Sequence, residues 1–262
     1  MSSPRSITSV NLLPKEEKLT IYRRFIPKAL IDRFEISSDF TDPQGNNLLT
    51  VKCREGSTDV VLDLRHKFGA EDPLLYAHLA DTMNGQIHVL LYIVNDPASP
   101  RFDVDRMPDG SPTKFGIFKR NIDAEVRAME AGLAPGQVRS GLRMLGDAIT
   151  SFEKFVTSLG HDIYFNEPLY YHNAIIFERY GFRYQQGRRL MESIHAGFES
   201  GGELSAALDG TTPFRRPEFA DSIRGRSWAL HDGIMGKPYS DITMYKVIGE
   251  MANIVTFPDA TW

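Results

Sequence analysis

The sequence predicts a mixed α/β fold in which helices flank a central, mostly antiparallel sheet. Residues 86–94 form a continuous apolar run, QIHVLLYIV, which is typical of a strand in the interior of a sheet. Residues 138–159 carry apolar side chains at steps of three and four, which predicts a long amphipathic helix. Helix and strand signals alternate from there to a last predicted strand at 241–248. We therefore expect this fold with an N-terminal extension and a long insertion before the last strand.

The composition limits the class of protein. The 262 residues are 42% hydrophobic and 24% charged, so the chain can bury a core without disulfides or a metal ion. The net charge of −4 gives no general attraction to nucleic acid. The lone Cys53 favours a reducing compartment, and there is neither a signal-peptide pattern nor an apolar run near the ~20 residues that cross a bilayer. We expect a cytoplasmic protein with no nucleic-acid partner and no membrane span.

The first part of the chain predicts a helix–strand extension over residues 1–85, packed on a main domain of residues 86–262. Apolar spacing over 15–34 predicts a helix, broken at Pro27 because proline lacks the N–H that a helix interior requires. The other elements expected before residue 120 are strands at 47–53, 58–64, 86–94, 102–105 and 113–118 and a helix at 70–84.

The second part begins with residues 123–133, whose propensities suit either a strand or a helix. The break at Pro135-Gly136 precedes the long helix 138–159, which Gly160 caps. The elements expected after it are a strand at 162–165, a helix at 168–180, a partly extended segment at 182–194, a helix at 217–230 and the strand at 241–248.

Two motifs lie within this order of elements. Residues 135–143 read PGQVRSGLR at a predicted helix start, where unpaired N–H groups and the helix dipole attract an anion. An ordinary helix start with two solvated arginines is the alternative. Residues 173–182 read NAIIFERYGF. Together these motifs resemble the Arg/Gln-x-x-Gly-x-Gly/Ala loop and the Tyr-x-x-x-Gly-Phe helix end of the GNAT family of N-acetyltransferases.

This resemblance implies an acyl-CoA-dependent acyltransferase that transfers an acyl group, acetyl in the simplest case, to an amine or another small nucleophile. Acetyl-CoA or another acyl-CoA would be the co-substrate and a small molecule the acceptor. The residues that the resemblance assigns to the CoA moiety are Gln137, Val138, Arg139, Ser140, Gly141, Leu142, Arg143 and Asn173.

The resemblance also assigns catalytic roles. Glu125 is the expected base, on a strand before the phosphate loop, with an oxyanion donor near Leu133. Phe177 stands where the family has a tyrosine that protonates the leaving thiolate, so Tyr180 is the expected substitute, with Tyr171, Tyr170 or the loss of the acid as alternatives. Arg143 likewise replaces a glycine. These departures keep open a second hypothesis, a non-catalytic acyl-CoA-type ligand-binding or structural protein on the same fold.

Substrate contacts are expected at Tyr171 and His172, in a tract dense in aromatic and polar groups, with core packing as the alternative. The insertion at about 197–240 is interpreted as a lid that brings Trp228 and His231 to the acceptor; a packing or dimerisation element, and hence a homodimer, is the other interpretation. None of the seven histidines has HxH or HExxH spacing, so no metal site is expected.

Overall fold

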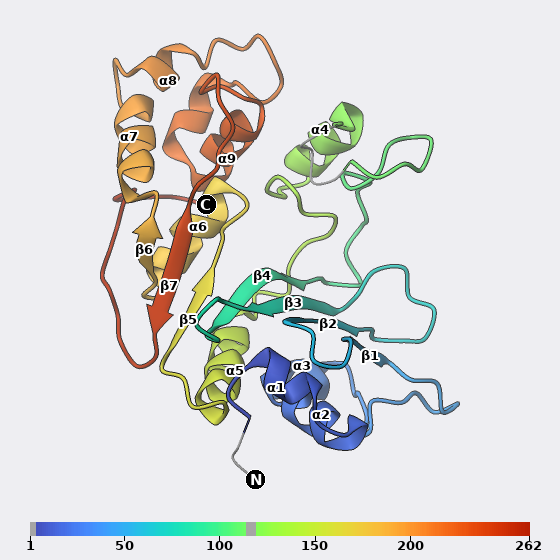
Figure 1. The fold of residues 1–262 in the computed structure, drawn as a ribbon. Helices are drawn as coiled ribbons and strands as arrows, with labels where there is room; N and C mark the ends of the chain where they lie inside the picture. Colours follow the sequence, from blue (N-terminus) through green and yellow to red (C-terminus); the bar gives the residue numbers. More distant parts are fainter. Residues whose placement is uncertain (1–3, 114–118) are drawn as a thin grey trace. The chain divides into compact units, whose positions relative to one another are not determined.

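The structure is a computed structural model that describes residues 4–113 and 119–262 (Figure 1). The predicted strand at 113–118 therefore falls almost entirely outside the described residues. Contacts divide the chain into two compact units. Unit 1 comprises Met1–Ala98, Gly141–Asn166 and Tyr245–Glu250, and unit 2 comprises Ser99–Ser140, Glu167–Met244 and Met251–Trp262. This division differs from the expected boundary at residue 85, because both units are built from separate stretches of the chain.

Unit 1 packs four helices and a 3₁₀ turn on its part of the sheet. Its helical elements are α1 (Ile7–Asn11), α2 (Lys15–Tyr22), η1 (Arg23–Phe25), α3 (Lys28–Arg33) and α5 (Leu145–Ser158). Its strands are β1 (Leu49–Lys52), β2 (Asp59–Leu64), β3 (Leu75–Asp81), β4 (Ile87–Val94) and β5 (Ile163–Asn166). The strand β7 (Thr243–Val247) begins in unit 2 and ends in unit 1. The predicted helix break at Pro27 is confirmed, since Pro27 caps α3.

Unit 2 is mostly helical. Its elements are α4 (Ile122–Glu130), α6 (Tyr171–Arg179), β6 (Arg183–Gln186), α7 (Arg188–Phe198), α8 (Glu203–Ala206), η2 (Pro217–Asp221) and α9 (Ile223–His231). The expected helix at 217–230 is thus a 3₁₀ segment followed by α9, and Ser222 caps α9 by accepting a hydrogen bond from the Gly225 amide. Among the described residues, no helix has the length and apolar character needed to span a membrane.

The described strands form one seven-stranded sheet in the order β1-β2-β3-β4-β5-β7-β6. The pairs β1–β2, β2–β3 and β3–β4 are antiparallel, whereas β4 and β5 are parallel. The predicted mixed α/β class with a mostly antiparallel sheet is confirmed. β3 corrects the helix expected at 70–84. Side chains along β3 alternate in burial, as they do in a strand. Pairing with β2 on one edge and β4 on the other decides the conformation of this segment, because its apolar spacing can suit a helix or a strand.

Aromatic side chains fill the core of unit 1. Tyr22 and Phe25 pack against Phe155 of α5, with ring centroids 6.2 and 5.5 Å apart. Phe152, one turn earlier on the same helix, meets Tyr164 of β5 at 5.1 Å. In Figure 1, α5 lies with α1–α3 below strands β1–β4. These aromatic contacts hold α5 against β5.

Three further predictions are wrong. The strand expected to carry Glu125 is instead helix α4, and Asn121 caps this helix by accepting from the Ala124 amide. Gly132, with φ +91°, lies in the turn that follows. Residues 102–105 form no strand within the described part of the chain. The helix expected from residue 138 begins only at Leu145, because Arg143 adopts φ +58°, outside the helical region.

Candidate functional site

Helices α6 and α9 of unit 2 pack against each other and bring several predicted site residues together. His172 lies in the first turn of α6, and Trp228 and His231 lie on α9. Trp228 is fully buried and its Nε1 donates to the carbonyl of Leu133, at 2.9 Å. The Trp228 ring stacks on Phe214 and meets His231 edge-on at 5.9 Å between centroids.

An ion-pair network joins α4 to the end of α9. Glu125 Oε1 lies 3.1 Å from His231 Nε2, and Glu125 Oε2 accepts two hydrogen bonds from Arg120, at 2.9 and 2.6 Å. Burial on its own would raise the pKa of the Glu125 carboxyl, but the hydrogen bonds and charges of His231 and Arg120 outweigh burial and lower that pKa. Glu125 is therefore an ionised, fully engaged carboxylate.

Asp232 extends the network. It accepts from Arg120 Nη1 at 2.9 Å, from Arg215 Nε at 2.9 Å and from the Thr212 hydroxyl at 2.8 Å. Burial would raise the pKa of Asp232, but these partners lower it. Arg120 thus connects two buried carboxylates, and its planar guanidinium also lies over the Phe214 ring.

A second polar contact joins α6 and α9. His172 Nδ1 lies 2.9 Å from the Ser227 hydroxyl, and the His172 ring stacks on Tyr170. Burial and the nearby His231 lower the pKa of His172 to about 3. Burial also raises the pKa of the Tyr170 hydroxyl. Both groups are neutral at physiological pH, so this pair carries no charge into the interior.

The structure brings Glu125, His172, Trp228 and His231 into this one cluster, as a shared site requires. Tyr171 is on α6 but packs edge-on against Tyr239 instead. Asn173, the next residue, is half-buried, and its backbone N–H donates to the Tyr170 carbonyl.

The structure does not bring Tyr180 together with Glu125. Tyr180 is the C-terminal cap of α6, whereas the cluster surrounds the first turn of that helix. Eight residues separate His172 from Tyr180, roughly 12 Å at 1.5 Å per residue. The geometry therefore gives no support to the expected acid–base pair of Glu125 and Tyr180. Sequence reasoning missed Arg120 and Ser227, which only the fold brings to this cluster.

The residues expected to hold CoA precede α5 rather than open it. Five of them lie in unit 2, and four of these five are in the segment before α5. Gln137 Oε1 accepts from the Ala134 amide, the Val138 carbonyl accepts from Phe102, and Arg139 and Ser140 bind Ser99. These bonds hold a bent, non-helical segment. Gly141, Leu142 and Arg143 belong to unit 1, and Leu142 is buried.

Within unit 1, β4 has two irregularities beside the start of α5. Leu79 of β3 pairs with Val89, but the next residue back, His78, pairs with Leu91, so Leu90 is an extra residue that forms a β-bulge. The parallel strand β5 ends at Asn166, opposite Val89. Residues 90–94 therefore continue without a β5 partner within the described residues.

The bulge also changes the direction of the side chains. Val89 and Tyr92 pair with Leu79 and Ala77, which are buried on one face of β3, so both lie on that face. Asn166, the partner of Val89, shares it. Neither Tyr92 OH nor Asn166 Oδ1 has a hydrogen-bond partner within the described residues, although both atoms are buried. Two unsatisfied polar atoms on one face, where two strands separate, indicate a place for polar ligand groups.

No protein-family model, no curated protein and no solved structure matches this chain. The described residues hold no group of three or more histidine, cysteine or acidic side chains arranged to bind a metal ion.

Proposed function

We propose that the protein is an acyl-CoA-dependent acyltransferase of GNAT type, which transfers an acyl group, acetyl in the simplest case, from acyl-CoA to an amine or another small nucleophile. The observation that carries the proposal is the parallel pair β4–β5, which separates beyond Val89 at the bulge of Leu90. Backbone N–H and C=O groups of residues 90–94 lack a β5 partner among the described residues, and they would pair with the amides of an extended pantetheine-like arm.

The start of α5 supports a phosphate site. Its N-cap, Met144, offers no side-chain oxygen to the first-turn N–H groups, which leaves them to attract an anion. Because α5 begins at Leu145, residues 143–148 lie at the helix start. They read RMLGDA and fit the Arg/Gln-x-x-Gly-x-Gly/Ala pattern better than residues 135–143 do. Gly141 lies near the carbonyl of Val94, so this loop passes the end of β4. Asp147, also in the first turn, opposes an anion by its charge.

Tyr92 replaces Tyr180 as our candidate acid. Its hydroxyl is buried and has no hydrogen-bond partner among residues 4–113 and 119–262, and burial raises its pKa, so it stays protonated and available to donate. The oxyanion donor belongs to the backbone at the bulge of β4. Glu125 has no part in this site, because its carboxylate is engaged by Arg120 and His231 in unit 2 and its lowered pKa makes it a poor base.

A second candidate function is binding of an acyl-CoA-type ligand without catalysis. Phe177, where the family has its acid, favours this reading, as does the absence of an assigned base. The two candidates share the ligand and differ only in the chemical step.

A thermal-shift assay with acetyl-CoA, longer acyl-CoAs and free CoA tests both. Binding to the folded protein raises Tm through mass action, by an amount that grows with ligand concentration. No shift at millimolar ligand would overturn both candidates. Release of free CoA thiol with a panel of small amines then separates them: turnover above spontaneous hydrolysis, lost in Tyr92→Phe with unchanged CoA binding, supports the enzyme. A shift without turnover supports the binding protein.

A further inference from the structure

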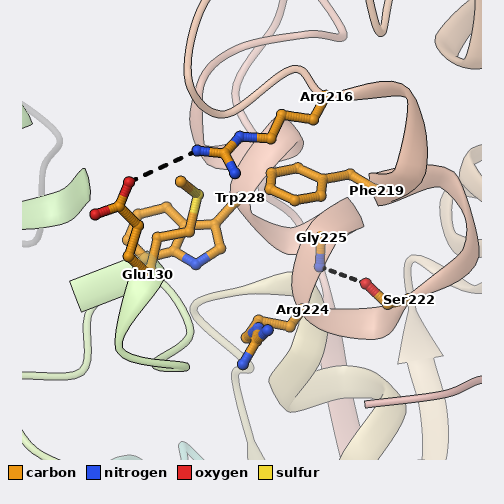
Figure 2. Close-up of a pocket in the computed structure, with 8 residues that line it drawn as sticks. Glu130, Arg216, Phe219, Ser222, Arg224, Gly225 and Trp228 are labelled. Carbon is orange, nitrogen blue, oxygen red and sulfur yellow. Dashed lines mark hydrogen bonds and ion pairs between the residues drawn. The ribbon is translucent and has the colours of Figure 1, made fainter. Parts of the chain in front are cut away.

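Unit 2 contains a cavity of about 270 Å³ between the end of α4 and the start of α9 (Figure 2). The residues that line it are Met129, Glu130, Arg216, Phe219, Ser222, Arg224, Gly225 and Trp228. Its volume is near the lower end of the ~300–1,000 Å³ typical of small-molecule sites. The cavity therefore suits a ligand with one ring or a short branched chain.

Three apolar side chains form much of its wall. Trp228 and Met129 are almost completely buried in the core cluster that Phe214 completes, and Phe219 packs against that cluster. The Trp228 ring is fixed by its hydrogen bond to the Leu133 carbonyl, so the wall is preformed. A rigid aromatic wall favours a flat apolar body at little cost in entropy.

The charged groups of the cavity do not cancel. Arg216 is directed towards Glu130, as Figure 2 shows, but the nearest atoms are 3.8 Å apart and both side chains are partly exposed. Arg224 donates only one hydrogen bond, from Nη1 to the Gly132 carbonyl at 2.8 Å, and forms no ion pair within the described residues. Two arginines and one glutamate thus line the cavity, and their formal charges sum to +1.

Gly132 fixes the position of Arg224. A Cβ at Gly132 would lie 3.1 Å from Arg224 Nη1, and the φ of +91° there disfavours any other residue. The Gly132 carbonyl accepts a hydrogen bond from Nη1 and so holds one edge of the Arg224 guanidinium. The remaining N–H groups are left to bind an acceptor, and a planar fork of this kind matches a carboxylate.

We propose that this cavity binds a small monocarboxylate with an aromatic or branched apolar body. Arg224 binds the carboxylate, with Arg216 adding positive charge, and the body packs on Trp228, Phe219 and Met129. The site lies wholly within unit 2 and does not depend on the acyltransferase proposal, which rests on unit 1.

Trp228 itself reports on binding. The chain has two tryptophans, and Trp262→Phe leaves Trp228 as the single emitter. In that background, phenylacetate is titrated against tryptophan emission, with its uncharged counterpart phenylacetamide as the matched ligand. We expect saturable quenching by phenylacetate and at least about tenfold weaker binding of the amide, because the charge-assisted bond to Arg224 is lost. Equal affinity for acid and amide, or no saturation by millimolar phenylacetate, would overturn the proposal.

Variants locate the site. Arg224→Gln should weaken phenylacetate binding about tenfold or more while barely changing the affinity for the amide. Arg188→Gln removes an exposed arginine of the same unit, paired with Glu192, and should leave both affinities unchanged. Equal effects of the two substitutions contradict the assignment. If Arg224→Gln does not fold, the comparison of acid with amide on the otherwise unaltered chain still decides the outcome.

Discussion

His172 Nδ1 lies 2.9 Å from the Ser227 hydroxyl, and this contact joins the first turn of α6 to the middle of α9 in the interior of unit 2. The ring is buried and His231 is nearby, so protonation of His172 in the folded state is strongly disfavoured, with a pKa of about 3. An unfolded chain has no such restriction, because its histidines titrate near pH 6.5. The contact therefore makes folding sensitive to mildly acidic pH.

We expect the free energy of unfolding to fall by about 2 kcal/mol between pH 7 and pH 5 on account of His172. The folded pKa is lowered, so the unfolded state takes up the extra proton below pH 6.5, and the loss continues towards pH 3. Urea unfolding at the two pH values measures it. His172→Gln keeps a hydrogen-bonding group but cannot titrate, and should abolish most of the difference. His78→Gln, at a partly exposed histidine, should preserve it. An unchanged pH difference in His172→Gln would contradict the assignment.

Arg120 should be the most costly single ion-pair residue to remove. It holds Glu125 and Asp232, both nearly buried, and Arg120→Met leaves two carboxylates short of a partner. We expect a loss of about 3–5 kcal/mol in urea unfolding. The matched Arg188→Met removes an exposed pair and should cost less than about 1 kcal/mol. Adding Glu125→Gln and Asp232→Asn to Arg120→Met should recover much of the lost stability, because no carboxylate is then left without its partner. Similar losses in Arg120→Met and Arg188→Met would refute the role of Arg120.

Gly136 should tolerate alanine less well than Gly110, although both have φ +81°. A Cβ at Gly136 would lie 2.4 Å from the Tyr170 ring, whereas nothing lies within 4 Å at Gly110. Gly110→Ala therefore measures backbone strain alone, about 1–2 kcal/mol. Gly136→Ala should cost about 1–3 kcal/mol more through overpacking. In a Tyr170→Leu background the excess should vanish, and its persistence would place the strain elsewhere.

The start of α5 gives a prediction that rests on the proposed function. Gly146→Glu puts a bulky negative charge in the first turn and should abolish the thermal shift by CoA. Thr150→Glu, at an exposed position one turn later, is the matched control and should keep it. Asp147→Asn removes the opposing charge and should tighten CoA binding several-fold. If Gly146→Glu binds CoA like Thr150→Glu, the phosphate site is not at this helix start.

Local signals in the sequence predicted an element correctly where they favour a single conformation. The apolar run at 86–94 is β4, and Gly160 and Gly181 follow the ends of α5 and α6 with positive φ. The helix predicted at 70–84 was wrong because pairing with β2 and β4 selects a strand for residues 75–81. The start of α5 was missed because hydrogen bonds with distant Ser99 and Phe102 hold residues 138–140 outside the helix.

The site was less predictable than the fold. Glu125 and His231 are 106 positions apart in the chain, and only the packing of unit 2 brings them together. Arg120 and Ser227 gave no signal at all, since a lone arginine or serine is most often solvated. The bulge at Leu90 depends on the register of two paired strands, which periodicity in one strand does not determine.

The sheet order has a consequence for synthesis of the chain. β5 lies next to β7, yet residues 167–242, which form most of unit 2, separate the two strands in sequence. On the ribosome, one edge of β5 therefore stays without its partner until nearly all of unit 2 has been made. An open strand edge is a site for pairing with other chains. Aggregation during expression should thus be governed by how quickly the late segment Tyr245–Glu250 reaches the sheet, and neither unit can be obtained by simple truncation.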